Sequence, residues 1–224
     1  MKNIKVTKDG PYVVTGSVPL GRENSIADES NIPAKWEKGE KIPAGEEYHL
    51  CRCGKSKGKP FCDGKHVKYG FDGTETAGSE KFNEKAEEKV GPDLILKDNV
   101  ELCAVARFCE AAGNVWDLTD KSNEPLARKK AIEESCNCPS GRLVACDRKG
   151  KEIEPKLDQE ISLIEDIALE MSGPIWVKGK IPIESVEGKE YEVRNRVTLC
   201  RCGRSQNKPF CDGTHLDIGF TDKN

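Results

Sequence analysis

Two segments of the 224-residue chain carry three cysteines and one histidine at the same spacing, Cys-x-Cys-x8-Cys-x3-His. The candidate ligands are Cys51, Cys53, Cys62 and His66 in the first segment, and Cys200, Cys202, Cys211 and His215 in the second. Twelve of the sixteen positions in 51–66 are identical in 200–215, and no Cys or His differs. Thiolate and imidazole bind zinc and iron–sulfur clusters, so the repeat predicts two metal sites.

The residues between the ligands fit such a site. Gly54 follows the Cys-x-Cys pair and frees the backbone, so that both thiolates can converge in a turn. Asp63-Gly64 is typical of a helix start. Cys62 and His66, four residues apart, would then lie on one face of that helix. A Cys3His set suits either a tetrahedral Zn²⁺ or a [2Fe–2S] cluster with two ligands on each iron, and the spacing leaves both open.

The residues around the ligands resemble the signature of the CDGSH iron–sulfur, or NEET, family. That signature is Cys-x-Cys-x2-Ser-x3-Pro-x-Cys-Asp-Gly-x-His, and both segments match it. The matching serines and prolines are Ser56, Ser205, Pro60 and Pro209. Lys65 and Thr214 replace the serine that precedes the histidine in the family name. That position is not a ligand, although Lys65 adds charge beside His66.

The resemblance implies a [2Fe–2S] cluster in each segment. It implies that Cys51 and Cys53, like Cys200 and Cys202, bind an inner iron. The outer iron is then bound by Cys62 and His66 in one segment, and by Cys211 and His215 in the other. Members with two motifs resemble a fused dimer, so the resemblance also implies an intrachain pseudo-twofold pair. The implied role is electron transfer or cluster transfer, with no enzyme activity of its own.

Two other functions remain open from the residues alone. The same ligands could hold zinc in a structural or interaction module, which would be colourless where an iron–sulfur protein is coloured. The chain could also be a subunit of an oxidoreductase, which would need a partner. The expected partner of a carrier is a redox protein or an apo-acceptor of iron–sulfur clusters.

Short strands must position the two segments. Gly10–Val14 is similar to Gly173–Val177, and each run is followed by a second short apolar run, at 18–20 and 181–183. Such β-branched and aromatic runs between Gly and Pro residues predict strands. Residues 21–47, an insert in the first copy, are polar and predict a surface loop. Residues 74–92 lack apolar periodicity and predict a linker.

The middle of the chain predicts a compact α+β insert. Strands are expected at 94–96 and 143–146, and a helix at 124–135 with Pro125 in its first turn. A further amphipathic helix is expected where Leu102, Val105, Ala106, Cys109 and Ala112 recur at helical spacing. The fold class is therefore α+β, with two small β-rich modules. We expect domains at 1–73, 94–171 and 172–224, with a linker at 74–93.

Five further cysteines lie in the insert, at 103, 109, 136, 138 and 146. The order of strands, helix, Leu-Cys-x5-Cys and Cys-Pro-Ser-Gly over 94–146 is similar to a divergent single-cluster ferredoxin-like domain. That similarity implies a further cluster whose fourth ligand is Cys136 or Cys146. In the alternative interpretation Cys103 and Cys109 are buried thiols on a helix, where their side chains would diverge by roughly 120°.

Composition and charge exclude several other classes of protein. The formal net charge of −3 gives no pull towards nucleic acid. No apolar run approaches the ~18 residues of a membrane span, and the first residues lack the apolar region of a secretion signal. We therefore expect a cytoplasmic protein, and the resemblance to a fused dimer implies that it is a monomer. An odd count of 11 cysteines argues against a disulfide framework.

The first metal segment and the residues after it are basic. They carry Arg52, Lys55, Lys57, Lys59, Lys65 and Lys68 against Asp63. These residues form either a solvated loop that offsets cluster charge or a docking patch for an acidic redox or acceptor protein.

Overall fold

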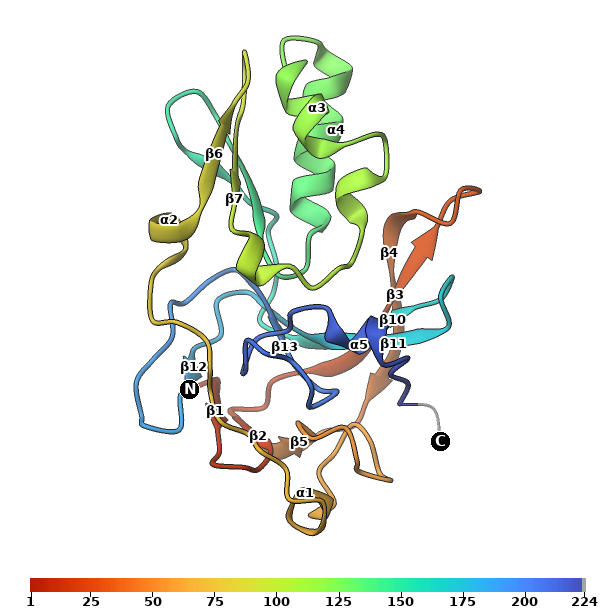
Figure 1. The fold of residues 1–224 in the computed structure, drawn as a ribbon, viewed down its shortest axis with the longest axis vertical. Helices are drawn as coiled ribbons and strands as arrows, with labels where there is room; N and C mark the ends of the chain where they lie inside the picture. The colour runs from red at the N-terminus through yellow and green to blue at the C-terminus, as the bar shows by residue number, and fades with distance from the viewer. Residues whose placement is uncertain (223–224) are drawn as a thin grey trace.

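A computed structural model describes residues 1–222. Its fold mixes three β-sheets with a few short helices, which confirms a fold that combines strands and helices. In Figure 1 the middle segment, with helices α3 (Val115–Asp120) and α4 (Pro125–Asn137), forms the upper end of the molecule. The two terminal portions of the chain build the sheets below it, and α1 (Lys65–Lys68) lies at the lower tip.

The first sheet has the order β12-β1-β2-β5. Three of its strands come from the N-terminal portion, namely β1 (Asn3–Val6), β2 (Tyr12–Thr15) and β5 (Glu47–Leu50). The fourth, β12 (Ile183–Glu184), comes from the C-terminal portion and pairs with β1 in parallel, Ile183 opposite Ile4. The predicted strand at 10–14 is therefore present as β2.

The second sheet has the order β13-β11-β10-β3-β4. The strands β10 (Ile161–Asp166), β11 (Met171–Lys178) and β13 (Arg196–Leu199) come from the C-terminal portion. The strands β3 (Leu20–Ala27) and β4 (Pro33–Ile42) come from the N-terminal portion, and β3 pairs with β10 in parallel. Each sheet therefore contains strands from both ends of the chain.

The expectation that residues 21–47 form a surface loop is wrong, because most of them form the β3–β4 hairpin. The strand β3 is difficult to predict from the sequence, because the side chains that it buries include polar ones. Glu23 is 6% exposed and forms an ion pair with Lys178, which is 2% exposed. Lys178 Nζ also lies 2.9 Å from Glu160 Oε1. A buried charge in a fully paired network is compatible with a sheet interior, although it lacks the apolar alternation of an ordinary strand.

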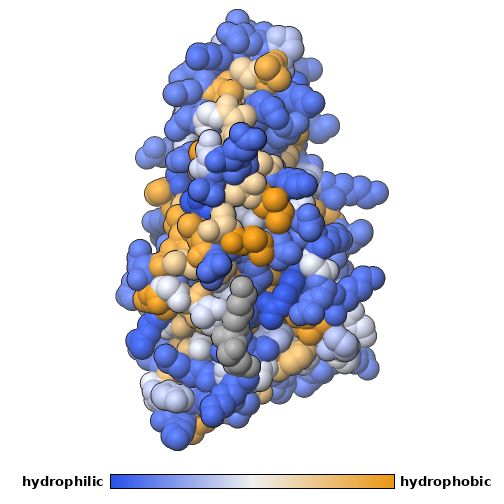
Figure 2. Space-filling view, turned by 90° about the vertical axis from the view of Figure 1, so that its right-hand side faces the viewer, coloured by the Kyte–Doolittle hydropathy of each residue, from blue (hydrophilic) through white to orange (hydrophobic). Residues whose placement is uncertain are grey.

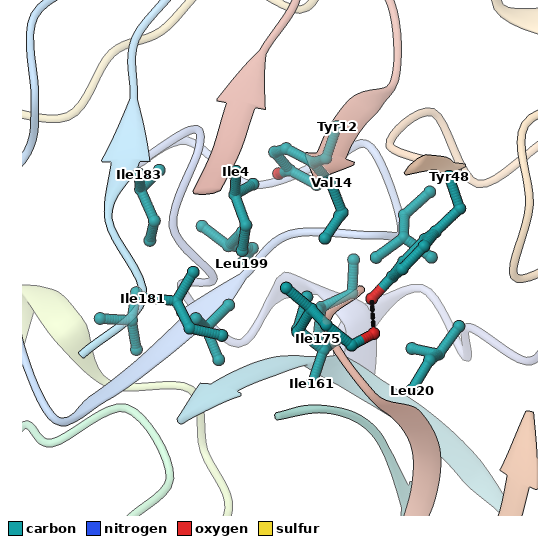
Figure 3. Packing of buried hydrophobic residues seen from close by; sticks show 14 of the residues in the cluster. Ile4, Tyr12, Val14, Leu20, Tyr48, Ile161, Ile175, Ile181, Ile183 and Leu199 are labelled. Atoms are coloured by element: carbon teal, nitrogen blue, oxygen red, sulfur yellow. Dashed lines mark hydrogen bonds between the residues drawn. The ribbon is translucent and has the colours of Figure 1, made fainter. Parts of the chain in front are cut away.

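An apolar core fills the space between these two sheets (Figure 3). Ile4, Tyr12 and Leu163 are fully buried in it, and each such aliphatic or aromatic side chain contributes about 1.5–3 kcal/mol by leaving water. The Tyr48 hydroxyl donates a hydrogen bond of 2.9 Å to the carbonyl oxygen of Val18, the dashed line in Figure 3. The core thus joins the two copies of the repeat.

The middle segment has its own sheet in the order β6-β7-β8-β9. Its strands are β6 (Glu87–Val90), β7 (Ile95–Asp98), β8 (Leu143–Cys146) and β9 (Glu152–Ile153). These strands and α4 confirm the strands and the helix predicted at 94–96, 143–146 and 124–135. A separate core of Leu94, Leu96, Val115, Ala131 and Leu143 joins the sheet to the helices. Residues 82–90, within the stretch expected to be a linker, form α2 (Phe82–Lys85) and β6.

The helix predicted through 102–112 is wrong. Only two 3-10 turns occur there, η1 (Val100–Leu102) and η2 (Phe108–Glu110). Between them Val105 and Arg107 have φ angles of 52° and 61°. A left-handed conformation at a β-branched residue is a true outlier and ends any helix. Phe108 is buried against a distant part of the chain, since its ring and that of Trp36 lie 4.4 Å apart.

Within residues 1–222, no helix combines the length and the apolar character that crossing a membrane requires. Figure 2 shows one face of the molecule, on which hydrophobic residues gather at mid-height. This is about the height at which the middle segment meets the second sheet in Figure 1.

Candidate metal centres

The first metal segment is a tight loop that begins where β5 ends. Leu50 and Phe61 form an isolated antiparallel bridge. On either side of it, Cys51 N–H donates to Pro60 O at 2.8 Å and Cys62 N–H donates to His49 O at 2.9 Å. Backbone pairing therefore sets Cys51 beside the segment that carries Cys62.

The four predicted ligands of this loop lie in two pairs. The sulfur atoms of Cys51 and Cys53 are 3.7 Å apart, and Cys62 Sγ lies 3.3 Å from His66 Nδ1. The second pair spans the start of α1, as the sequence predicts. The Asp63 carboxylate stabilises that start by accepting hydrogen bonds from the N–H groups of Lys57, at 2.8 Å, and Lys65, at 3.2 Å.

The second metal segment repeats this geometry at the end of β13. Leu199 bridges Phe210, the sulfurs of Cys200 and Cys202 are 3.7 Å apart, and Cys211 Sγ lies 3.4 Å from His215 Nδ1. The histidine belongs to α5 (Thr214–Asp217). The similar ligand pairs follow from the similar loop sequences, in which every Cys and His is shared.

Each Cys-x-Cys pair favours one thiolate. A hydrogen bond from the Cys53 thiol, helped by backbone N–H groups, lowers the pKa of Cys51 to about 6, while the pKa of Cys53 is raised. In the second segment the bond from Cys202 lowers the pKa of Cys200 to about 6. The thiolate is the form of cysteine that binds metal, so Cys51 and Cys200 are the members of the two pairs that are favoured as ligands near neutral pH.

The two segments meet through their Cys-x-Cys-Gly turns. A Cβ atom at Gly54 would lie 2.6 Å from Cys202 O, and one at Gly203 would lie 2.7 Å from Cys53 O. The contact is reciprocal, and the absence of a side chain at both glycines permits it. Sequence reasoning assigned Gly54 a role in the turn but missed this approach of the two backbones.

The outer pairs differ in exposure. Cys62 and His66 are half-buried, whereas Cys211 is 3% and His215 is 5% exposed. Val105 of the middle segment causes much of the difference, because its Cγ2 lies 2.3 Å from the position of a Cβ at Gly213. His215 and Leu216 line a small cavity together with Val105 and its neighbours Ala104 and Ala106.

Burial governs the titration of the second outer pair. It lowers the pKa of His215 to about 4, and the charge of Arg201 lowers it further. It also raises the pKa of Cys211, as do nearby cysteines that include Cys103 of the middle segment. A neutral imidazole is the form that binds metal, so the environment of His215 suits a ligand.

A buried arginine follows the first cysteine of each segment, with different partners. Arg201 forms ion pairs with Asp222 and with Glu165, the latter at 2.9 Å. Arg52 donates instead to the backbone carbonyls of Thr7 and Gly73. Sequence reasoning missed Glu165 and Asp222, because neither belongs to a recognisable motif. Glu165 lies far before Arg201 in the chain, and Asp222 lies beyond the repeated segment.

Three cysteines of the middle segment lie close together. Burial raises the pKa of Cys109 to about 12, and the charges of Cys138 and Cys103 contribute. Arg142 Nη1 donates to Cys103 Sγ at 3.1 Å, and Cys109 and Cys138 pack on the same apolar cluster. No helix runs through 102–112, so the helical geometry expected to separate the side chains of Cys103 and Cys109 is absent.

The other two cysteines point elsewhere. Cys136 Sγ donates to Ile153 O at 3.5 Å, and Cys146 is fully buried in an apolar cluster with Phe82 and Val144. The expectation that one of them supplies a fourth ligand is not supported by this placement. Their positions follow from α4 and β8, whose packing directs each side chain away from the other three thiols.

Among residues 1–222, no three Cys, His, Asp or Glu side chains converge closely enough to hold one metal ion. The eight predicted ligands meet two by two, as four pairs. Their chemistry, three thiols and an imidazole per segment, fits an iron–sulfur cluster with two ligands on each iron.

Comparison with protein families agrees with this donor set. Residues 9–67 and 172–216 match the family of iron-binding zinc fingers of the CDGSH type. Residues 90–148 match the family described as a divergent 4Fe–4S mono-cluster. Comparisons with curated proteins and with solved structures gave no match.

The two ligand loops therefore define a protein with the CDGSH type of iron-binding motif in tandem. Between the two motifs lies a segment that matches the divergent 4Fe–4S family.

Proposed function

We propose that the chain binds two [2Fe–2S] clusters and carries electrons or clusters between other proteins. Cys51, Cys53, Cys62 and His66 would hold the first cluster, and Cys200, Cys202, Cys211 and His215 the second. When bound, such a cluster accepts and returns one electron. The observation that carries the proposal is the arrangement of each ligand set as two separate pairs.

The pairing favours a two-iron cluster over zinc. A tetrahedral Zn²⁺ needs its four ligands around one point, at about 2.0–2.3 Å from the ion. Here the close approaches are within pairs, and no three candidate ligands among residues 1–222 share a point. A [2Fe–2S] cluster needs two ligands at each iron, which is the arrangement that the pairs provide.

We further propose that the modules 1–73 and 172–224, the second together with the preceding strand β10, are related by a pseudo-twofold axis. The sheet orders β12-β1-β2-β5 and β3-β10-β11-β13 support this, since equivalent strands occupy equivalent places. The reciprocal contacts of Gly54 and Gly203 support it as well. The two inner pairs would then face each other near the axis.

The histidines give these sites a chemistry that four cysteines would not. A neutral imidazole replaces one thiolate, so the oxidised site is less negative and its reduction potential rises. His66 and His215 would fill this role in the two segments. The half-buried position of His66 would leave the first cluster open to a partner.

In a second candidate function the chain also holds a further cluster, in its middle segment. Cys103 and Cys138 are near enough to Cys109 for their charges to raise its pKa, and this part of the chain matches a mono-cluster family. The match and the three neighbouring thiols support a site that holds a cluster through three protein thiolates. Iron content separates the candidates, because two [2Fe–2S] clusters contain about four irons per chain and a third cluster raises this to about seven or eight.

The test is an anaerobic, iron-replete preparation of the full chain, analysed for iron, zinc, sulfide and visible absorption. We expect thiolate-to-iron absorption bands, with at least about four irons per chain. A colourless protein loaded with zinc under these conditions would refute the proposal. Transfer to an apo-ferredoxin, followed optically with and without a reductant, then separates cluster donation from electron transfer.

A further inference from the structure

We propose that the first metal segment presents a docking surface for a protein with an acidic patch. We call it the basic face and define it by the lysines and the two apolar side chains around Cys62 and His66. Its members are Lys55, Lys57, Lys65, Val67, Lys68 and Tyr69. The inference rests on the proposed carrier function and identifies the side of the molecule on which a partner binds.

Charge is the first argument. Residues 51–69 contain six basic side chains and one acidic one, whereas the equivalent residues 200–218 contain three basic and two acidic. Lys57, Lys65 and Lys68 correspond to Gln206, Thr214 and Asp217. The second segment builds the same ligand pairs without these lysines. They are therefore not needed to form the ligand pairs, and their charge favours binding of an acidic partner.

The acidic groups nearby are engaged within the chain. The Asp63 carboxylate lies 3.0 Å from Lys65 Nζ and accepts two backbone N–H bonds. Asp72 and Asp9 accept bonds from the N–H groups of Thr74 and Gly73 at 2.9 Å each. The lysines outnumber these carboxylates, so the field around the first outer pair stays positive.

Exposure is the second argument. The helix α1 buries none of its residues, and Val67 and Tyr69 are 77% and 58% exposed. An apolar and aromatic centre with a charged rim is the usual composition of a protein interface. Figure 1 shows α1 at the lower tip, at the opposite end from α3 and α4, so the middle segment leaves this surface open.

The second outer pair cannot offer the same approach. Val105 lies on Gly213, and His215 is only 5% exposed. A partner that must come close to a cluster therefore has access at the first segment and not at the second. The chain presents one docking side, although it contains two copies of the motif.

The test uses the full-length, cluster-loaded protein and an acidic plant-type [2Fe–2S] ferredoxin as the probe. The variant Lys57→Gln/Lys65→Thr/Lys68→Asp carries the residues of the second segment and so keeps a loop sequence that this fold accepts. The control Lys149→Gln/Lys121→Thr/Lys151→Asp makes the same charge change at exposed lysines of the middle segment. Dissociation constants are measured by calorimetry from low to moderate salt.

We expect the basic-face variant to bind the ferredoxin at least tenfold more weakly at low salt and to lose most of its salt dependence. The control should stay within twofold of the unaltered protein. Equal weakening in both variants, or binding of anionic vesicles but not of ferredoxin, would overturn the proposal. So would an unaltered protein that does not bind. Visible absorption and iron content are recorded for every sample, so a loaded protein that does not bind refutes only the docking surface, and an unloaded one refutes the carrier function.

Discussion

The Tyr12 hydroxyl donates a hydrogen bond to the carbonyl oxygen of Cys200 at 2.8 Å, and it also lies 3.0 Å from Pro209 O. A fully buried side chain from the first copy thus stabilises the ligand loop of the second. In the second copy Ile175 takes the equivalent place in the aligned Gly-Pro runs, and isoleucine has no hydroxyl to donate. The two ligand loops are therefore supported differently although their own residues agree.

Replacing Tyr12 by Phe tests this support. The buried carbonyl oxygen of Cys200 loses its hydroxyl donor, so we expect the free energy of unfolding to fall by about 1–3 kcal/mol. Release of the second cluster to an iron chelator should accelerate, measured optically in a Cys62→Ser background that leaves only the second ligand set complete. The control is Tyr48→Phe, which keeps the ring and removes only a hydrogen bond to Val18 O, a carbonyl of the same core that belongs to neither ligand loop. Equal acceleration in both variants would contradict the assignment.

The contact between the two Cys-x-Cys-Gly turns predicts that alanine at Gly54 damages the second segment as well as the first. The added Cβ would lie 2.6 Å from Cys202 O, and φ at Gly54 is 71°. Gly64→Ala is the matched control, because φ is 81° there and nothing lies within 4 Å of the added atom. Both variants carry backbone strain of about 1 kcal/mol, and only the first carries the clash.

We expect Gly54→Ala to lose iron from both sites and Gly64→Ala to keep the iron of the second. Iron per chain and the absorption spectrum measure this. If both variants kept the second cluster equally well, the two turns would not depend on each other.

The cover over the second outer pair predicts a separate effect of Val105. Glycine at this position relieves a left-handed backbone that costs about 1–3 kcal/mol, and it removes the side chain packed on Gly213. We expect Val105→Gly to leave thermal stability equal or higher while chelators extract the second cluster several-fold faster. Val67→Ala, an exposed valine of α1, should change neither. Slower extraction in Val105→Gly would show that Val105 does not act as a cover.

Glu134 gives a pH-dependent prediction away from the two ligand loops. It is 2% exposed, one of its oxygens has no hydrogen-bond partner among residues 1–222, and burial raises its pKa to about 7. The folded state thus holds a proton that the unfolded state releases near pH 4.5. Stability from this group is present below about pH 4.5 and is lost as pH rises to about 7, by up to about 1.4 kcal/mol per pH unit.

Glu134→Gln should remove that slope and stabilise the protein at pH 7 and above. Urea unfolding at pH 5, 6, 7 and 8 measures the effect. Glu133→Gln on the same helix is the control, because ion pairs with Lys129 and Lys130 hold the pKa of that exposed carboxyl below its usual value. A variant that kept the slope of the unaltered protein would show that Glu134 does not titrate in this range.

The geometry of the ligand loops was predictable because it depends on residues that are close together in the sequence. Gly54, Asp63 and the four-residue spacing of Cys62 and His66 act over a few residues, and the repeat gave each of them twice. The strands at 94–96 and 143–146 and the helix at 124–135 were predictable for the same reason, since apolar runs and Pro125 mark them directly.

The predictions that failed concern features that depend on contacts between residues far apart in the sequence. The strand β3 buries Glu23 against Lys178, so its sequence lacks the apolar alternation by which strands are found. The residues from Leu102 to Ala112 have helical spacing, but Phe108 packs on Trp36 and Val105 on Gly213, so no single face is buried. The ferredoxin-like similarity offered Cys103, Cys109 and Cys138 as a joint site, but the expected helix argued against it, and the structure has a loop with two 3-10 turns there instead.

The parallel pairing of β1 with β12 affects folding during synthesis as well as the finished structure. Ile4 pairs with Ile183, so the first sheet lacks an edge strand until nearly the whole chain has left the ribosome. The first ligand loop follows β5 and is synthesised much earlier. Its cysteines are therefore exposed until the core is complete. Such long-range closure is slow. We therefore expect cluster insertion to follow completion of synthesis, and a nascent chain halted before β12 to bind iron poorly in its first segment.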